Sequence, residues 1–519
     1  MNNIPVLFRS LIIFGVCVVL AIVLGYMLAT PLTYSQLFTY GLLLTILLFP
    51  ILLRWHYPLM LLCWNLSAVA FFLPGHPSMA LLMIMISLGI SILQRTISRD
   101  SRFIGVPQLT FPLLFMIAVI AVTAKLTGVG LRLFGGEVYG GQKYFYLLGG
   151  ILGYFALSAY QIPPNRRNLY LGLYFLGGLP AFIGDIFPWL PHWTYFIYYF
   201  FNFNQYYFGT NDITGESVRF SGAVPTSLAA ISFMLARYGL RGIFLEGKIW
   251  RPVVFMVFPI YGLLGGFRSF VLLVGLTLVL MFFLERLHRT RFMPVMVLTM
   301  VLGGAVLVPL APHLPYTFQR TLAFLPLNVD PAARVDAQNS ADWRYQMWQA
   351  LLPQIPEYLL LGKGYVISPL DYDFVMGADA SVHNTFAESQ GLALSEDFHS
   401  GPISVIIPFG IWGAIAFLWF VIAGIRVLYA NYRNGDPELQ TVNSFLLAAF
   451  IAQTIYFLFV VGAFSGDMIK FCGLLGLSVS FNGGMRKPAP ATRPAPEPQP
   501  TGNFGRLPRT PVAAFQRRG

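Results

Sequence analysis

The chain has 519 residues, of which 56% are hydrophobic and only 10% are charged. This composition excludes an ordinary soluble domain, in which about a quarter of the residues are charged. The formal net charge of +12 does not indicate a nucleic-acid partner, because basic residues collect on the cytosolic side of membrane proteins. We therefore predict an all-α, polytopic membrane protein that binds no nucleic acid.

Apolar runs recur along the chain, many of them about 18 residues or longer, which is enough to cross a bilayer as a helix. The runs are continuous rather than alternating, so they favour helices over a closed barrel. We expect about 12–14 membrane-spanning helices. The candidate segments are 10–28, 35–53, 57–73, 77–94, 108–124, 143–161, 168–187, 221–238, 250–265, 268–285, 292–311, 402–426, 440–461 and 467–482. The first segment resembles a signal peptide, but it is long and lacks a clear cleavage site, so we interpret it as an uncleaved helix.

The distribution of basic residues gives the expected orientation. With the N-terminus inside, the arginine clusters around Arg95, Arg166, Arg237 and Arg286 all fall on the cytosolic side, and acidic residues show the opposite bias. This asymmetry predicts that both termini are cytosolic.

The chain divides into four parts: a first bundle at 1–311, a large external loop at 312–401, a second part of the bundle at 402–482, and a tail at 483–519. The loop is too long for a simple connector and carries a helical pattern around Arg344, in WRYQMWQALLPQIPEYLL, so we expect it to be partly helical. The tail is proline-rich and basic, which predicts a disordered cytosolic segment near lipid headgroups. The aromatic stretch at 188–220 is expected at the membrane interface.

Metal chemistry is not favoured by the sequence. The three cysteines lie in apolar segments and are interpreted as core residues. The spacing of Asp371, Asp373 and Asp379 is distantly like that of a calcium loop, but the glycine and closing glutamate are out of register. We predict no metal site and no cofactor.

Three basic residues each precede a helix that begins on the predicted outer side: Arg219, Arg268 and His399. Free N–H groups at such a helix start, combined with a guanidinium, form a good phosphate site. Membrane-interface anchoring remains the alternative for each arginine, because residues such as Lys143 and Lys470 occupy similar positions. A histidine there suits a general base or proton relay.

The stretch from His399 to Gly413, HSGPISVIIPFGIWG, resembles a pattern of the O-antigen ligase family. That pattern is His, then Asn, Ser or Gln, nine residues, Gly, two residues and Gly, which Ser400, Gly410 and Gly413 match. The two glycines lie three apart, and we expect them on one helical face that permits close backbone approach. The loop holds a second pair, His383-Asn384, but Leu394 stands where the first glycine is needed.

Three further patterns extend this resemblance. Arg268 followed by Leu272 matches an Arg-x-x-x-Leu helix start. Arg344 leads a loop helix that ends in a Gly-x-Gly turn, and VRFSGAVPTSLA resembles an "R..G…PN" stretch led by Arg219, with Thr226 in place of Asn. The similarity covers roughly 215–430.

The resemblance implies a metal-independent glycosyltransferase of the bacterial inner membrane, with its large loop in the periplasm. The donor would be a glycan on undecaprenyl diphosphate, and the acceptor a hydroxyl of a glycan, lipid A-core or a protein. Arg268, with Arg219 and Arg344, would bind the diphosphate, and His399 would orient or deprotonate the acceptor. Ligase, polymerase and protein glycosylation remain open.

A transporter or lipid-linked oligosaccharide flippase is the alternative from another class. Transporters place ionisable residues near the bilayer midplane and are often built from inverted repeats. Here nearly all charges fall near the ends of spans and no repeat is detectable, which favours the enzyme. A scaffold protein would explain the spans but not the ordered motifs. The enzyme hypothesis further predicts that Arg268 and His399 share the rim of one cavity.

Overall fold

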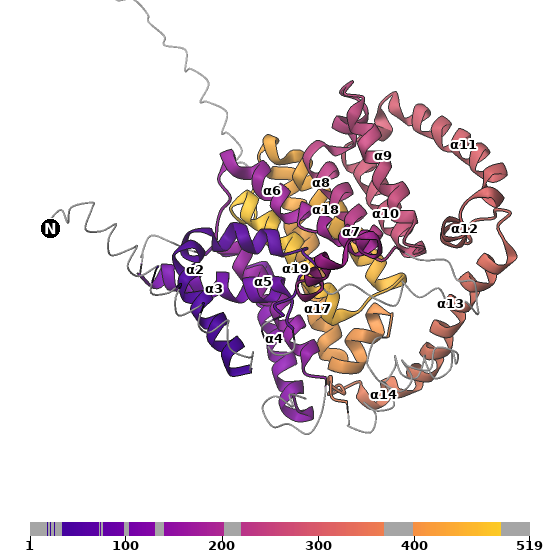
Figure 1. Ribbon diagram of the computed structural model, residues 1–519. Helices are drawn as coiled ribbons and strands as arrows, with labels where there is room; N and C mark the ends of the chain where they lie inside the picture. Colours follow the sequence, from indigo (N-terminus) through magenta and orange to yellow (C-terminus); the bar gives the residue numbers. More distant parts are fainter. Residues whose placement is uncertain are drawn as a thin grey trace, which may run out of the picture. The chain divides into compact units, whose positions relative to one another are not determined.

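The computed structural model describes residues 18, 21, 25, 34–71, 73, 76–97, 103–129, 140–201, 220–367 and 398–488. Helices provide nearly all of their regular structure (Figure 1), beside two isolated bridges, Ala68 with Phe201 and Val69 with Ser78. Arg219, His383, most of the predicted span at 10–28 and the tail beyond 488 lie outside the described residues.

The helices follow one another along the chain as α2 (Tyr34–Cys63), α3 (Met79–Ile97), α4 (Pro107–Thr127), α5 (Gln142–Ser158), α6 (Arg167–Leu176), α7 (Phe182–Ile186), α8 (Ala223–Phe244), α9 (Trp250–Leu263), α10 (Arg268–Leu284), α11 (Phe292–Leu310), α12 (Tyr316–Leu322), α13 (Pro331–Leu351), α14 (Ile355–Tyr358), α17 (Gly401–Asn434), α18 (Gln440–Phe459) and α19 (Phe464–Asn482). Short 3-10 turns connect several of them.

Among the described residues, eight helical segments are long and apolar enough to cross a membrane, and α9 and α10 are shorter apolar helices. From 77–94 onward, each span predicted from the sequence coincides with a helix, except that 168–187 is divided into α6, α7 and short 3-10 turns. The prediction of an all-α polytopic membrane protein is therefore confirmed.

One pair of predicted spans is wrong. The segments 35–53 and 57–73 were expected to be separate, but α2 runs through both without a break as far as Cys63. The gap between the two predicted segments contains Arg54, Trp55 and His56. The helix continues through this gap, and the Nδ1 atom of His56 lies 2.9 Å from the Ser87 hydroxyl on α3, so a polar side chain inside the span has a hydrogen-bond partner on the neighbouring helix.

The core of the bundle is centred on α19, which packs against α5, α17 and α18 and is 78% buried over its membrane-length window. Glycines allow this close packing. A Cβ atom added at Gly150 of α5 would lie 2.8 Å from the backbone nitrogen of Ile469, and one at Gly476 would lie 2.7 Å from the Cβ atom of Leu157. These contacts fix the position of the C-terminal helix relative to the first half of the chain.

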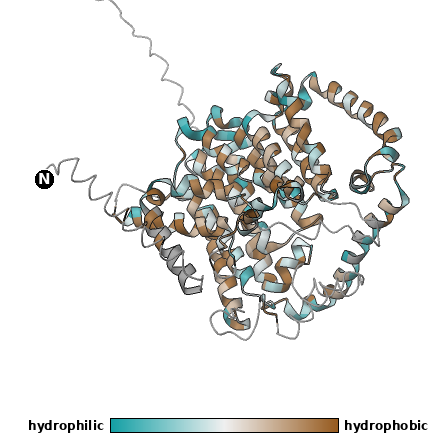
Figure 2. Cartoon of the chain, viewed as in Figure 1, coloured by the Kyte–Doolittle hydropathy of each residue, from teal (hydrophilic) through white to brown (hydrophobic). Residues whose placement is uncertain are grey.

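The helices α11 and α13 differ sharply in hydropathy, as Figure 2 shows. None of the apolar window of α11 is buried within the chain, as expected of a helix whose surface faces lipid. By contrast, α13 is polar. Asp330 caps its N-terminus, because the Asp330 carboxylate accepts a hydrogen bond of 2.8 Å from the Ala332 amide. Helix formation in the large loop is confirmed, although α13 starts well before the pattern around Arg344.

Candidate functional site

Arg268 is the first residue of α10, where no side chain caps the helix. Two residues earlier, Gly266 has a left-handed backbone conformation, with φ of 70°, and this turn leads the chain into α10. One terminal nitrogen of Arg268 donates a hydrogen bond of 2.8 Å to the carbonyl of Ala337 on α13. The half-buried guanidinium therefore lies at the positive end of the α10 dipole, where an anion is favoured.

Arg344 lies seven residues after Ala337 on α13, about two helical turns along the same face. Burial, reinforced by the positive charge of Arg268, lowers the pKa of the Arg344 guanidinium. An arginine stays charged despite such a shift, so Arg268 and Arg344 are neighbouring, half-buried cations. A bound anion would relieve their mutual repulsion.

His399 has a left-handed backbone conformation, with φ of 46°, which is strained for a non-glycine residue by about 1–3 kcal/mol. The residue before it, Phe398, is 1% exposed, and its carbonyl accepts a hydrogen bond of 3.0 Å from the indole nitrogen of Trp348. The residue after it, Ser400, precedes the first turn of α17 and accepts a bond of 2.9 Å from the Ser404 amide. His399 is thus held between α13 and the start of α17.

One face of α13 connects these elements. Ala337, Arg344 and Trp348 are spaced by seven and four residues, so they project from the same side of the helix. Through them α13 contacts the start of α10 at Arg268 and the start of α17 beside His399. Three of the four motifs predicted from the sequence, those of Arg268, Arg344 and His399, therefore meet at one end of the bundle, which we call the site end.

The α17 helix is broken inside the HSGPISVIIPFGIWG stretch. Gly410 has φ of 63° and ψ of −159°, and Pro408 has no N–H to donate. The expectation that Gly410 and Gly413 share one regular helical face is therefore wrong, because Gly410 is not helical. Both glycines are buried, but only Gly413 is helical.

Residues 359–364 fill the break in α17. The carbonyl of Leu359 accepts a hydrogen bond of 2.7 Å from the Ile411 amide, and the Lys363 amide donates one of 2.8 Å to the Ile407 carbonyl. The glycines of the predicted Gly-x-Gly turn, Gly362 and Gly364, both have φ above 70°. A Cβ atom at Gly362 would collide with the Pro408 carbonyl. The Gly-x-Gly turn that follows the Arg344 helix therefore packs against the broken backbone of α17 and hydrogen-bonds to it.

Two other predicted residues are placed differently. Leu272 is 42% exposed, so it does not pack into the protein core. Thr226, at the position of the family's Asn, is 5% exposed and donates a hydrogen bond of 3.2 Å to the Leu179 carbonyl. It therefore stabilises the start of α8 by a contact within the fold.

The structure adds a cation that the sequence interpretation had set aside as an interface anchor. Lys470 of α19 forms an ion pair of 2.8 Å with Asp467. Tyr456, in the last turn of α18, lies within electrostatic reach of both Arg344 and Lys470. A lysine inside an apolar span, with an acid three residues earlier, is a sequence signal that could have identified this residue.

Over the ranges that the structure describes, no group of three or more His, Cys, Asp or Glu side chains is placed to hold a metal ion. Cys63 and Cys472 are buried and form no disulfide, as expected of core residues.

The family model described as O-antigen ligase matches residues 253–418, about a third of the chain. The matched segment begins in α9 and ends in α17, and it contains Arg268, Arg344 and His399 but not Lys470. The match confirms the resemblance seen in the motifs and supports O-antigen ligase-like glycosyltransferase activity in general. No curated protein matches the chain.

Proposed function

We propose that this membrane protein, which carries an O-antigen ligase domain at residues 253–418, transfers a glycan from undecaprenyl diphosphate to an acceptor hydroxyl on the periplasmic side of the bacterial inner membrane. The observation that carries the proposal is the pair of neighbouring, half-buried guanidinium groups of Arg268 and Arg344, joined to His399 through α13. This arrangement lies within the segment that matches the family model.

The two arginines suit a diphosphate leaving group. Guanidinium groups match phosphate oxygens with paired hydrogen bonds. When the bond between the anomeric carbon and the diphosphate oxygen breaks, the electron pair stays on that oxygen. Fixed positive charges placed there stabilise the transition state more than the ground state, which is the condition for catalysis. Arg219 is proposed to join them, as the family resemblance implies.

His399 is proposed to act on the acceptor. Its imidazole would orient the acceptor hydroxyl or take its proton as the hydroxyl oxygen attacks the anomeric carbon. The strained backbone at His399 supports this role, because such conformations are retained where the surrounding structure fixes a functional side chain. Residues 312–401, proposed as the periplasmic loop, would shape the access of the acceptor.

The direct test uses the purified full-length protein in detergent with an undecaprenyl-diphosphate-linked glycan and candidate acceptors. Formation of glycosylated acceptor, lost in His399→Ala at equal protein level, supports the proposal. Detergent micelles have no compartments, so a flippase would give no product in this assay. Absence of product with lipid A-core, glycan and peptide acceptors alike would refute the enzyme.

The acceptor class is tested by deleting the gene and separating the surface glycans on a gel. Loss of all long chains from the lipid core indicates a ligase, whereas loss of chain length alone indicates a polymerase. A change confined to glycoproteins indicates protein glycosylation.

A further inference from the structure

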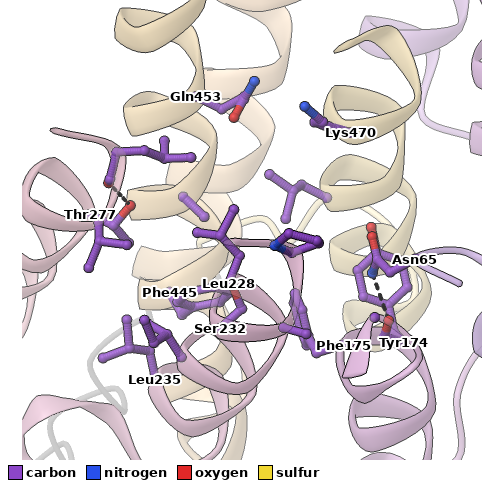
Figure 3. Close-up of a pocket in the computed structure, with 18 of the residues that line it drawn as sticks. Asn65, Tyr174, Phe175, Leu228, Ser232, Leu235, Thr277, Phe445, Gln453 and Lys470 are labelled. Carbon is purple, nitrogen blue, oxygen red and sulfur yellow. Dashed lines mark hydrogen bonds between the residues drawn. The ribbon is translucent and has the colours of Figure 1, made fainter. Parts of the chain in front are cut away.

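Two cavities among the described helices differ in their charge. The first, of about 410 Å³, lies between α6, α8, α10, α18 and α19. Figure 3 shows Gln453 and Lys470 near each other on its lining, and Lys470 is the only charged side chain among the described residues that line it. The Lys470 ammonium is paired with the Asp467 carboxylate at 2.8 Å, so the charge of this cavity is already balanced.

The second cavity, of about 560 Å³, lies at the opposite end of α10 from Arg268. Three arginines line it: Arg241 in the last turn of α8, Arg286 just after α10, and Arg433 in the last turn of α17. Glu285 is the only acid among the described lining residues. Three cations against one carboxylate leave an excess of two positive charges, so this cavity favours an anion.

The partners of these charged groups leave two of the arginines accessible. The oxygens of the Glu285 carboxylate accept hydrogen bonds of 2.9 Å from the Leu240 and Arg241 amides, so the backbone already uses this acid. Among the described residues, neither Arg286 nor Arg433 has a hydrogen bond or an ion pair through its side chain, and both are exposed. A phosphate would therefore replace water on these guanidinium groups rather than a protein partner, and we expect a ligand that exchanges readily.

The backbone of Arg286 is also unusual. Its φ is 57°, the left-handed conformation that a glycine commonly adopts just after the end of a helix. The Arg286 amide donates a hydrogen bond of 3.0 Å to the Phe283 carbonyl, which holds this turn in place. Non-glycine residues in such strained conformations are typical of ligand-binding positions. An arginine at a position that suits glycine therefore points to a use for its side chain.

The outer surface of α17 indicates that the anion carries apolar chains. Leu418, Ile422, Tyr429 and Arg433 follow one another at spacings of four, seven and four residues, so they share one face of the helix. All four are exposed, as is Arg426 on the same face. An exposed apolar stripe thus leads along α17 to an arginine that lines the cavity. A phospholipid fits this surface, since its chains cover the stripe and its headgroup reaches the basic end of the span.

We propose that this cavity binds the phosphate headgroup of an anionic glycerophospholipid, whose acyl chains lie along the exposed face of α17. Basic pockets between spanning helices on the cytosolic side are suited to such headgroups, and the sequence predicts that Arg286 faces the cytosol. The lipid then joins the ends of α8, α10 and α17 to the start of α18, where Gln440 and Thr441 also line the cavity. It lies at the other end of α10 from Arg268, so the inference goes beyond the proposed function and does not depend on it.

The test measures lipid binding to the purified full-length protein in detergent by native mass spectrometry. The probes are phosphatidylglycerol and phosphatidylethanolamine with the same acyl chains, and inorganic phosphate is compared with them by thermal unfolding. Arg433→Gln removes one cation of the cavity. Arg289→Gln is the matched control, because Arg289 is exposed at the same end of α10 but does not line the cavity.

We expect the wild type to bind phosphatidylglycerol at least fivefold more tightly than phosphatidylethanolamine, whose ammonium cancels the charge of its phosphate. Arg433→Gln should weaken phosphatidylglycerol binding about fivefold or more, and Arg289→Gln less than twofold. Arg286→Gly is a second variant that protects the test against unfolding, because glycine adopts the left-handed conformation without strain. It should keep or raise the melting temperature in lipid-free detergent and still weaken phosphatidylglycerol binding about fivefold.

Equal affinities of the wild type for the two lipids would overturn the inference, as would equal losses of phosphatidylglycerol binding in Arg433→Gln and Arg289→Gln. Inorganic phosphate distinguishes a lipid from a soluble anion. If it stabilises the wild type against heat as much as phosphatidylglycerol does, the cavity binds a soluble anion and the lipid assignment is wrong. The outcome of the glycan-transfer assay alters none of these results.

Discussion

The two ends of α10 both carry arginines, but they use them differently. At the site end, Arg268 and Arg344 are half-buried, and burial, followed by the positive charge of Arg268, lowers the pKa of the Arg344 guanidinium. At the opposite end, Arg286 and Arg433 are exposed and, with Arg241, line a cavity of about 560 Å³. Exposed arginines at a membrane boundary are well hydrated, whereas partly buried ones retain a charge that a ligand can neutralise.

Each end also contains a broken helix, and the groups that satisfy the break differ. At Gly239 of α8, where φ is 64°, the Glu285 carboxylate accepts hydrogen bonds of 2.9 Å from the amides of both Leu240 and Arg241. At Gly410 of α17, the hydrogen-bond partners come instead from the backbone of residues 359–364. One break is closed by a single side chain and the other by a loop that belongs to the site. The number of charges does not distinguish the two ends. They differ in how deeply the arginines are buried and in which groups hydrogen-bond to the backbone at each helix break.

The largest expected effect comes from the predicted site residues. Arg268→Ala and His399→Ala should each lower glycan transfer by about 10²-fold or more, since removing one transition-state donor typically has this effect. Arg286→Ala, at the opposite end, should stay within about twofold of wild type. Transfer is measured in detergent at matched protein level, and a loss in Arg286→Ala equal to that in Arg268→Ala would erase the contrast between the ends.

His383→Ala provides a comparison between two histidines of the same loop. We expect a much milder loss than in His399→Ala, because His383 lacks the glycine spacing of the family motif. Equal losses in the two histidine variants would show that the motif spacing selected the wrong histidine.

The next largest effect is expected for Gly410→Ala, which should lower the stability of the protein. The added Cβ would lie 2.6 Å from the Leu359 carbonyl, and the left-handed conformation is strained for alanine, so we expect a destabilisation of about 1–3 kcal/mol. Gly275→Ala on α10 is the matched control, because nothing lies within 4 Å of its Cβ position; it should be neutral or slightly stabilising. Thermal unfolding in detergent measures both variants. Equal melting temperatures would contradict the claim that the break in α17 requires glycine at position 410.

Trp348→Phe tests how α13 positions His399. The ring is kept, but the hydrogen bond to the Phe398 carbonyl is lost, at a net cost of about 0.5–1.5 kcal/mol. We expect kcat to fall severalfold while KM for the donor lipid is little changed. Trp412→Phe, on an exposed tryptophan of α17, should alter neither parameter. A change in melting temperature without a change in kcat would assign Trp348 a purely structural role.

The smallest effect is expected at Glu285, and it depends on pH. Burial raises the pKa of the Glu285 carboxyl, although the two backbone hydrogen bonds oppose the shift. A raised pKa means that ionisation costs stability in the folded state, so this contribution is lost as pH rises through the folded pKa. The melting-temperature advantage of wild type over Glu285→Gln should therefore be greatest in acid and shrink toward neutral pH, with glycan transfer unchanged. An advantage that grows with pH would contradict this sign.

Most of the fold was predictable because apolar runs of membrane length have few alternatives to helix. The continuity of α2 was not predicted, since the polar residues between its two apolar runs suggested a boundary, and the partner of His56, Ser87, is supplied only when α3 packs beside α2. The break at Gly410 was hidden for a similar reason. The sequence shows a proline and a glycine in an apolar run, but it does not show that residues 359–364 will occupy the gap.

The candidate site was predictable where its residues stand in short motifs, as Arg268, Arg344 and His399 do. Trp348 carries no such signature, and its contact with Phe398 depends on the path of α13. Lys470 resembled an interface anchor because the sequence shows the acid three residues earlier, Asp467, but not the cavity beside Lys470, which forms only when α18 and α19 are packed together.

The insertion of residues 359–364 into α17 has a consequence for protein engineering. The segment that precedes α17 and the α17 helix itself share backbone hydrogen bonds, so they do not behave as exchangeable modules. A chimera that grafts a foreign loop onto this scaffold would leave Ile407 and Ile411 without their partners. Swaps intended to redirect acceptor choice should therefore transplant everything from Asp330 through Gly413 as one cassette.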